Sequence, residues 1–310
     1  MGYTYPVRHQ TGTLTTEQLH LLLKNPRLIA RQVASLTNEK FLADYLLSGR
    51  YDAAGGGVYY ETETGDLYTG TDPEAIEPAG DYPLIQLDEG VPSAARTVKF
   101  GQGSVITDEK ISREGNQYVQ KALMRVGNQM VRYVDTVAWG VIASRVSSTS
   151  AATSDGVGAW TTAGNVLGHL MTVREARAEL ATGLDLDTVV LPSAKWAKLV
   201  GMLVDDGALP REQGNIALSG TAPVSAFGMT WLTSPHITGT DPWLFDTAQL
   251  GGMADEKLLS EEFAAAGQTG VEASTTRISD NDSYLVRGRR VTVPIVTEPQ
   301  AGVKLTGTGL

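Results

Sequence analysis

The feature that most constrains the fold is a single long helical pattern between Thr107 and Val146. Its apolar residues recur at steps of three and four, the spacing that places side chains on one face of an α-helix. The members of this face are Val119, Leu123, Val126, Met130, Val134, Val137 and Val141. A helix of about 40 residues spans roughly 60 Å, more than a compact domain of this size needs. We therefore predict a spine helix over 107–146 on which other parts of the chain are built.

The ends of this pattern and its glycines refine the prediction. Thr107 can cap the start of the helix. Asp108 and Glu109 place carboxylates in the first turn, where the helix dipole favours anions. Gly115 costs on the order of 1 kcal/mol relative to Ala inside a helix, so we expect a bend or a late start near it. Taken alone, this segment is also compatible with a core helix of an ordinary enzyme.

Composition limits what the chain can be. Its 310 residues, 42% of them hydrophobic, can bury a large core in one or two domains. A net charge of -10 argues against a chain that is, as a whole, dedicated to binding nucleic acid or anionic membranes. The absence of cysteine excludes disulfides, thiolate catalysis and cysteine-based metal sites. Neither a signal peptide nor a run of ~18 apolar residues occurs, so we expect a soluble cytosolic chain.

Charge is distributed along the chain in blocks of opposite sign. Residues 1–50 carry six basic side chains against three acidic ones. Residues 51–95 carry ten carboxylates and no Lys or Arg, and residues 96–146 return to eight basic side chains against four acidic ones. Such blocks predict surfaces that meet, either within a subunit or between copies. An acidic, solvated loop is the alternative interpretation of residues 51–95.

The acidic block also lacks any helical period. Glycines at its start, four prolines and two alternating segments, VYYETETG and RTVKFGQG, predict two extended arms joined by a polar tip. We therefore expect a long β-hairpin over 51–98. A stretch of this length with little capacity for a core of its own usually serves binding or interaction.

The remaining segments predict a mixture of helices and strands. Helices are expected in two pieces within 14–47, over 161–182, and from Pro192 and Ser193 onward. A buried strand is expected over 188–191, with short strands in the last third of the chain. Residues 147–158 and 205–219 are expected to be loops. Because no βαβ period repeats, the predicted fold class is α+β.

The sequence shows no constellation of catalytic or metal-binding residues. Its four histidines lack a second ligand at metal-binding spacing, and Gly101–Ser104 lacks the lysine of a phosphate-binding loop. Three carboxylate pairs occur without an identifiable partner base: Asp185 with Asp187, Asp205 with Asp206, and Glu261 with Glu262. We expect no catalytic residue, no cofactor and no metal site.

The order of these parts resembles the major capsid protein of tailed bacteriophages. The resemblance runs from about Tyr51 to Gly307 and includes VLPSAKWAKLVGM, FGMTWLTSP, DPWLFDTAQLGG and RGRRVTVPIVTEPQAGVKLTG. It implies the Hong Kong 97 phage-type capsid fold, with an N-terminal arm, an extended β-hairpin loop, a peripheral domain and an axial domain. The implied bounds are 1–50 for the arm, 51–98 for the extended loop, 99–183 with 284–310 for the peripheral domain, and 184–283 for the axial domain.

The resemblance also assigns residues to contacts between subunits. The extended loop would lie across a neighbouring subunit through its carboxylates, which include Glu61, Glu63, Asp66, Asp72, Glu74 and Glu77. The basic surface that would receive it on the spine comprises Lys110, Arg113, Lys121, Arg125 and Arg132. A loop near the symmetry axes would carry Asp205, Asp206, Arg211 and Glu212. Each exposed pair is worth only about 0 to 1 kcal/mol, so many repeated contacts would stabilise the shell.

The implied function is that of a structural protein and not of an enzyme. Copies would form the hexamers and pentamers of an icosahedral shell, built in the host cytoplasm, that encloses double-stranded phage DNA without sequence-specific binding. Portal and decoration proteins, with either a separate scaffolding protein or none, are the expected partners, and no membrane is involved. Residues 51–95 contain no lysine, so an isopeptide crosslink from the loop is not expected. Only about 50 residues precede the loop, so no large self-scaffold is expected.

Two alternatives stay open from sequence. An encapsulin, a compartment that holds cargo enzymes, would have the same fold and differ in its contents. An acidic soluble hydrolase would instead need two of Asp185, Asp187, Asp205 and Asp206 to converge in one pocket with perturbed pKa values.

Overall fold

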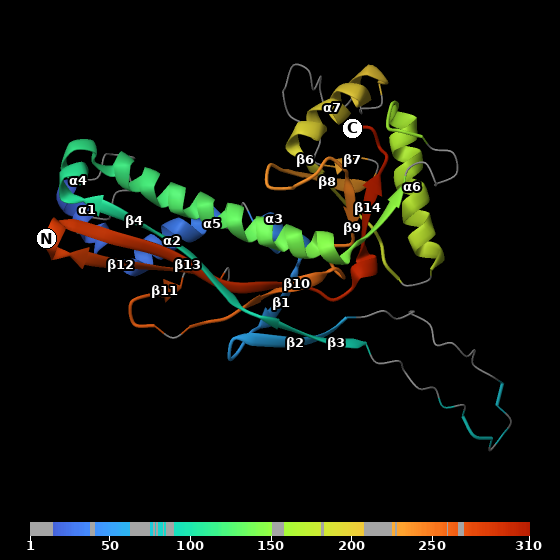
Figure 1. Cartoon of the computed structure of the whole chain (residues 1–310), viewed down its shortest axis with the longest axis horizontal. Helices are drawn as coiled ribbons and strands as arrows, with labels where there is room; N and C mark the ends of the chain where they lie inside the picture. Colours follow the sequence, from blue (N-terminus) through green and yellow to red (C-terminus); the bar gives the residue numbers. More distant parts are fainter. Residues whose placement is uncertain are drawn as a thin grey trace, which may run out of the picture.

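The computed structural model shows one elongated body with a hairpin at its side (Figure 1). The structure describes residues 15–37, 41–62, 75–76, 78, 80–82, 84, 90–150, 158–180, 183–207, 225–226, 228–258, 260–265 and 270–310. Two sheets of six strands each organise the body, and a separate two-stranded sheet forms the hairpin. The longest helix among the described residues runs along the first sheet and ends beside the second (Figure 1).

The first sheet contains the longest strand of the described chain. Its strands are β1 (Gly49–Asp52), β4 (Val98–Thr107), β10 (Gly251–Asp255), β11 (Ala264–Ala265), β12 (Val271–Ile278) and β13 (Ser283–Val296). β13 lies at the centre, antiparallel to β4 on one edge and to β12 and then β10 on the other. β1 adds in parallel to β10, so the segment before the hairpin is fixed to this sheet.

The predicted spine is two helices, α4 (Asp108–Glu114) and α5 (Asn116–Arg145). Gly115 separates them with a φ of 62°, a left-handed conformation that glycine adopts without steric cost. The expected break at this residue is therefore confirmed. The expected cap is not confirmed, because the Thr107 side chain makes no capping hydrogen bond. The chain is already extended through β4 up to Thr107, which sets where the helix can begin.

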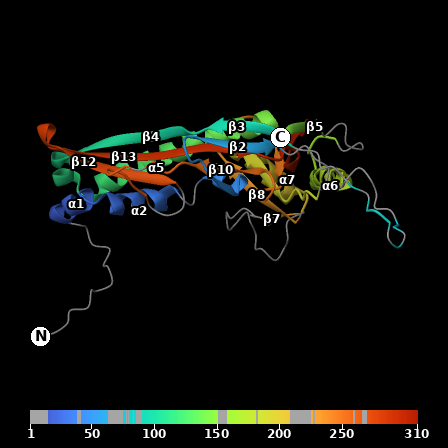
Figure 2. The same cartoon turned by 90° about the horizontal axis from the view of Figure 1, so that it is seen from below.

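The apolar face of α5 packs on the first sheet, as its period of three and four residues predicts. Val119, Leu123 and Val126 are buried against β4 and β13. Gly288 of β13 permits this close approach, because a Cβ atom there would lie 2.9 Å from the Met130 sulfur. The N-terminal helices α1 (Thr16–Leu23) and α2 (Pro26–Thr37) lie along the same sheet, with α2 against α5 and β12 (Figure 2).

The hairpin expected over 51–98 is present at its base. β2 (Gly57–Thr62) pairs antiparallel with β3 (Val91–Arg96), in a register that joins Gly57 to Arg96 and Thr62 to Val91. These two strands form a sheet of their own beside the body (Figure 1). Most of the segment between them lies outside the described residues.

The second sheet and two helices form the other end of the body. Its strands are β5 (Ser147–Ser150), β6 (Thr188–Pro192), β7 (Ser225–Ala226), β8 (Met229–Ser234), β9 (Trp243–Phe245) and β14 (Gly302–Thr306). They follow the order β5-β14-β9-β6-β8-β7. The helices α6 (Ala163–Glu179) and α7 (Ser193–Asp205) share a separate apolar core with this sheet. Thr162 caps α6 by accepting a hydrogen bond from the Asn165 backbone.

The strands are grouped differently from the predicted domain bounds. β14 was expected with β13 in the peripheral part, but it pairs with β5 and β9 in the second sheet. β10 and β12 were expected in the axial part, but both pair with β13 in the first sheet. Residues 147–150 were expected to be a loop and instead form β5. β12 and β13 are consecutive in the chain, whereas β5, β10 and β14 pair with strands that lie far along the chain, about which local pattern carries no information.

No helix among the described residues is both long enough and apolar enough to cross a bilayer.

Candidate assembly surfaces

The basic face of the spine is exposed and largely unpaired. Lys121, Arg125 and Arg132 lie four and seven residues apart on α5, on the side away from the sheet, and all three are exposed. None of them forms an ion pair with another residue that the structure describes. Three unpaired cations on one stripe of a rigid helix form a surface that can receive an anionic partner.

The two predicted basic residues of α4 differ in their pairing. The Lys110 ammonium contacts the Glu114 carboxylate at 3.0 Å, and this hydrogen bond raises the pKa of Lys110. Arg113 is exposed and has no such partner among the described residues. Lys110 is therefore partly neutralised within its own helix, whereas Arg113 is available to another molecule.

The hairpin base has one face on the body and one in solvent. Val58 and Tyr60 pack against the small cluster of Ala53, Ala254 and Ile295 on the first sheet. The next side chain along, Tyr59, points to the other face and is 90% exposed. A large aromatic ring left in water on a projecting strand is a typical contact residue between proteins.

The structure locates only part of the predicted acidic surface. Glu61 is exposed on β2. The other predicted carboxylates of the hairpin lie outside the described residues, and these are Glu63, Asp66, Asp72, Glu74 and Glu77. Asp205 and Asp206 are exposed at the end of α7, while Arg211 and Glu212 of the predicted axial loop also fall outside the described residues.

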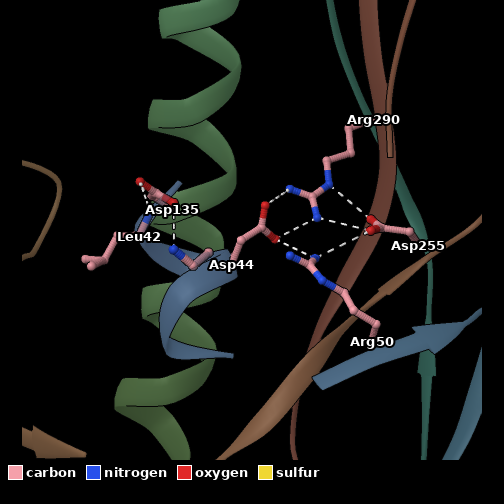
Figure 3. Close-up of polar contacts among 7 residues, drawn as sticks. Leu42, Asp44, Arg50, Asp135, Asp255 and Arg290 are labelled. Atoms are coloured by element: carbon pink, nitrogen blue, oxygen red, sulfur yellow. Dashed lines mark hydrogen bonds and ion pairs between the residues drawn. The ribbon is translucent and has the colours of Figure 1, made fainter. Parts of the chain in front are cut away.

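A largely buried ionic cluster, which no local sequence pattern predicts, joins β1, β10 and β13 to Asp44 (Figure 3). The Arg290 guanidinium, on β13, is completely buried. It donates to both Asp44 oxygens at 2.8 and 2.9 Å and to the two Asp255 oxygens at 3.0 and 3.2 Å. Arg50 approaches the same two carboxylates, at 2.8 Å from Asp44 and 3.8 Å from Asp255. The cluster therefore holds two positive and two negative charges.

A second buried carboxylate fixes the same N-terminal segment to the spine. Asp135 of α5 is 4% exposed and accepts hydrogen bonds from the backbone of Leu42 at 3.3 Å and of Ala43 at 3.0 Å. These two donors lie at the start of α3 (Leu42–Leu46). Burial raises the pKa of Asp135 to about 6, against the lowering effect of the two backbone hydrogen bonds. Asp44 and Asp135 thus join α3 to the sheet and to the spine helix, respectively.

The carboxylates proposed for a hydrolase do not form a common site in the structure. Asp185 pairs with Arg174 at 2.7 Å, and Asp187 accepts from Thr188. Asp206 accepts from the backbone of Ala163. Within the part of the chain that the structure describes, no three His, Asp or Glu side chains are grouped as they would be around a metal ion.

Comparisons with known proteins agree with this architecture. Residues 90–305, well over half of the chain, match a family model described as phage capsid protein. No curated protein sequence matches the chain.

Similar folds occur in solved capsid and particle structures. The capsid structure of the cyanophage P-SCSP1u has a TM-score of 0.55 and 12% identity, covering 86% of this chain and 87% of its own. A virus-like particle from Pyrococcus furiosus has a TM-score of 0.55 and 12% identity, covering 89% and 97%. A structure of phage G with its major capsid and decoration proteins has a TM-score of 0.51 and 11% identity, covering 84% and 87%.

Proposed function

The chain belongs to the phage capsid protein family and has the α+β, Hong Kong 97 phage-type capsid fold, and we propose that it builds a closed shell around DNA. In this proposal the protein is the major capsid subunit of a tailed bacteriophage. Copies assemble in the host cytoplasm into hexamers and pentamers of an icosahedral capsid that encloses the double-stranded genome. The protein serves as a structural component of the virion.

The observation that carries this proposal is the two-stranded hairpin beside the body. An isolated pair of strands is at best marginally stable in water. Among the described residues, only its inner face, with Val58 and Tyr60, has a partner on the same chain, while Tyr59 stays 90% exposed. The outer face therefore requires a surface on another molecule, and a second copy of the subunit supplies one.

We propose that the acidic hairpin of one subunit lies on the basic spine of its neighbour. Residues 51–95 supply ten carboxylates and no cation. On the neighbour, Arg113 and Lys121 are exposed and unpaired among the described residues, whereas Lys110 already contacts Glu114. Each such pair contributes about 0 to 1 kcal/mol, so the contacts provide register and add up only over a closed shell.

The remaining assignments of the shell follow the fold. We propose that the first sheet with α5 forms the peripheral domain and that the second sheet with α6 and α7 forms the axial domain. The segment after α7, from Asp205 and Asp206 through Arg211 and Glu212, is proposed to crowd around the symmetry axes. Separate scaffolding, portal and decoration proteins are the proposed partners; decoration proteins accompany the major capsid protein in the phage G structure.

A second candidate is an encapsulin-type compartment. The similarity to the virus-like particle from Pyrococcus furiosus supports it, because that particle has this fold and is not described as a phage capsid. The two candidates differ in what the shell contains: a protein cargo for the compartment, and DNA or nothing for the phage capsid.

The proposal is tested by the size and contents of the purified assembly. Negative-stain electron microscopy with light scattering should show closed icosahedral particles, or rings of five and six subunits. Nuclease-resistant DNA inside particles recovered from infected cells would support the phage capsid, and a co-purified enzyme would support the compartment. A uniform monomer or dimer that does not assemble under crowding or with a scaffolding protein would contradict both.

A further inference from the structure

An open cleft of about 1180 Å³ lies between α3, the exposed side of α5 and the end of β8. Its lining includes the three arginines Arg50, Arg125 and Arg132, together with His236. Asp44 is the only carboxylate among the described residues that line it. In a chain with a net charge of -10, a cleft with this composition stands apart from the average surface.

No described residue fully neutralises the positive charge of this cleft. Asp44 already binds Arg290, at 2.8 and 2.9 Å, and Arg50, at 2.8 Å. The Arg290 side chain is completely buried, so it pairs with Asp44 from behind the cleft. Arg125 and Arg132 are exposed and form no ion pair with any described residue. Two guanidinium groups therefore remain available to a ligand.

His236 lines the same cleft and is affected by the positive charge of Arg132. Its pKa is lowered by burial and, in addition, by the positive charge of Arg132. At neutral pH the ring is therefore uncharged and can serve as a hydrogen-bond donor, while Arg132 carries the charge. The cleft thus combines two free guanidinium groups with neutral polar side chains, and that combination suits an extended anion.

We propose that this cleft binds the phosphate backbone of DNA. Guanidinium groups match phosphate oxygens with two parallel hydrogen bonds, and they stay charged at every physiological pH. Arg125 and Arg132 are seven residues apart on α5, about 10 Å along the helix. The phosphates of one strand rise by about 3.4 Å each along the duplex axis, so two arginines about 10 Å apart can reach different phosphates of one strand. Contacts to phosphate carry no sequence information, as expected for a shell that accepts any genome segment.

This inference rests on the proposed enclosure of DNA, because it places the cleft on the genome-facing side of the shell. The rival occupant is the acidic hairpin of a second copy, whose carboxylates would also satisfy Arg125 and Arg132. Carboxylates and phosphates can be distinguished directly by offering both to the same cleft.

The test measures binding of a fluorescently labelled 20-base-pair DNA to the unassembled full-length subunit, by anisotropy at several salt concentrations. The cleft variant is Arg125→Gln with Arg132→Gln. The matched control is Arg27→Gln with Arg145→Gln, which removes two exposed arginines that do not line the cleft. Unfolding temperatures establish that both variants fold, and a peptide of residues 60–90 is offered in parallel.

The expected result is at least a tenfold loss of DNA affinity in the cleft variant, while the control keeps the affinity of the original chain. The slope of log affinity against log salt concentration should also fall in the cleft variant, by the amount that corresponds to about two phosphate contacts. Any of three results would overturn the inference. Both variants could lose DNA affinity equally, the original chain could fail to bind DNA, or the cleft variant could lose binding of the peptide alone. Particle formation is scored separately by microscopy. Shells that assemble without DNA binding contradict this inference alone, and a subunit that binds DNA but forms no shell contradicts the proposed function alone.

Discussion

Two regions of the subunit use charge in opposite ways. In the buried cluster, Arg290 and Arg50 meet Asp44 and Asp255, and every charge has its partner on the same chain. On the spine surface, Lys121, Arg125 and Arg132 are exposed and have no ionic partner among the described residues. The first arrangement fixes the segment that leads into the hairpin. The second is complete only when another molecule supplies the anions, which is what a subunit of an assembly requires.

The strongest test of this contrast is Arg290→Met. Removing this guanidinium leaves Asp44 and Asp255 with Arg50 alone, so we expect the free energy of unfolding to fall by about 3–5 kcal/mol. The control is Arg174→Met, which breaks the exposed pair with Asp185 and should cost at most about 1 kcal/mol. Denaturant unfolding of the unassembled subunit gives both values. Similar costs for the two variants would contradict the distinction between buried and exposed pairs.

The substitution Asp135→Asn tests the buried carboxylate of α5 through the pH dependence of the free energy of unfolding. The pKa of Asp135 is about 6 in the folded chain and about 3.9 in an unfolded one. The folded state therefore binds an extra proton between these values. Asp135 thus makes a contribution to stability that is full below pH ~4 and is lost as pH rises through ~6, worth up to about 3 kcal/mol.

The variant lacks this titration, so its free energy of unfolding should change less between pH 4.5 and pH 7 than that of the original chain. Other titrating groups cancel in the difference between the two proteins. An identical pH dependence in both would show that Asp135 does not titrate in this window.

Substitutions of Tyr59 and Tyr60, two neighbouring tyrosines of β2, compare the outer and inner faces of the hairpin. Tyr59→Ser should leave subunit stability within about 0.5 kcal/mol, because this side chain is 90% exposed. The same change should weaken each subunit contact by about 1–2 kcal/mol and so raise the protein concentration needed for assembly. Tyr60→Ser should instead destabilise the subunit itself, because Tyr60 packs on the first sheet. Unfolding and light-scattering assays separate the two effects.

The smallest expected effect is that of Lys121→Glu. Reversing one exposed charge of the spine should weaken assembly by about 1 kcal/mol or less per contact, and less still in high salt. Lys257→Glu makes the same charge change at an exposed site after β10 and should leave assembly unchanged. If the two variants assemble alike at low salt, the hairpin does not contact Lys121.

Local pattern predicted those parts of the fold whose causes are local. The apolar period of α5, the break at Gly115 and the strand and helix on either side of Ser193 all follow from neighbouring residues. The α+β class and the capsid fold are likewise confirmed by the comparisons. The exposed face of the spine could be read from the same helical period, because polar residues follow the side opposite Val119 and Leu123.

The buried cluster and the strand pairing could not be predicted in this way. Asp44 and Arg290 are 246 residues apart in the sequence, and an aspartate on a short N-terminal helix looks like any exposed one. Residues 147–150 are serines and a threonine that favour turns, yet they form β5 because β14 offers them a parallel partner. In the case of β5 a tertiary contact overrides local propensity.

The place of β14 in the second sheet determines when that sheet can be completed during synthesis. β14 lies between β5 and β9, pairing Val303 with Ser147 on one side and with Leu244 on the other. Until residues 302–306 have left the ribosome, β5 and β9 each present an open strand edge at the end of the spine. Open edges pair readily with other chains. Pairing of β14 with β5 and β9 therefore covers these edges, and the subunit becomes less prone to aggregation before it joins a shell.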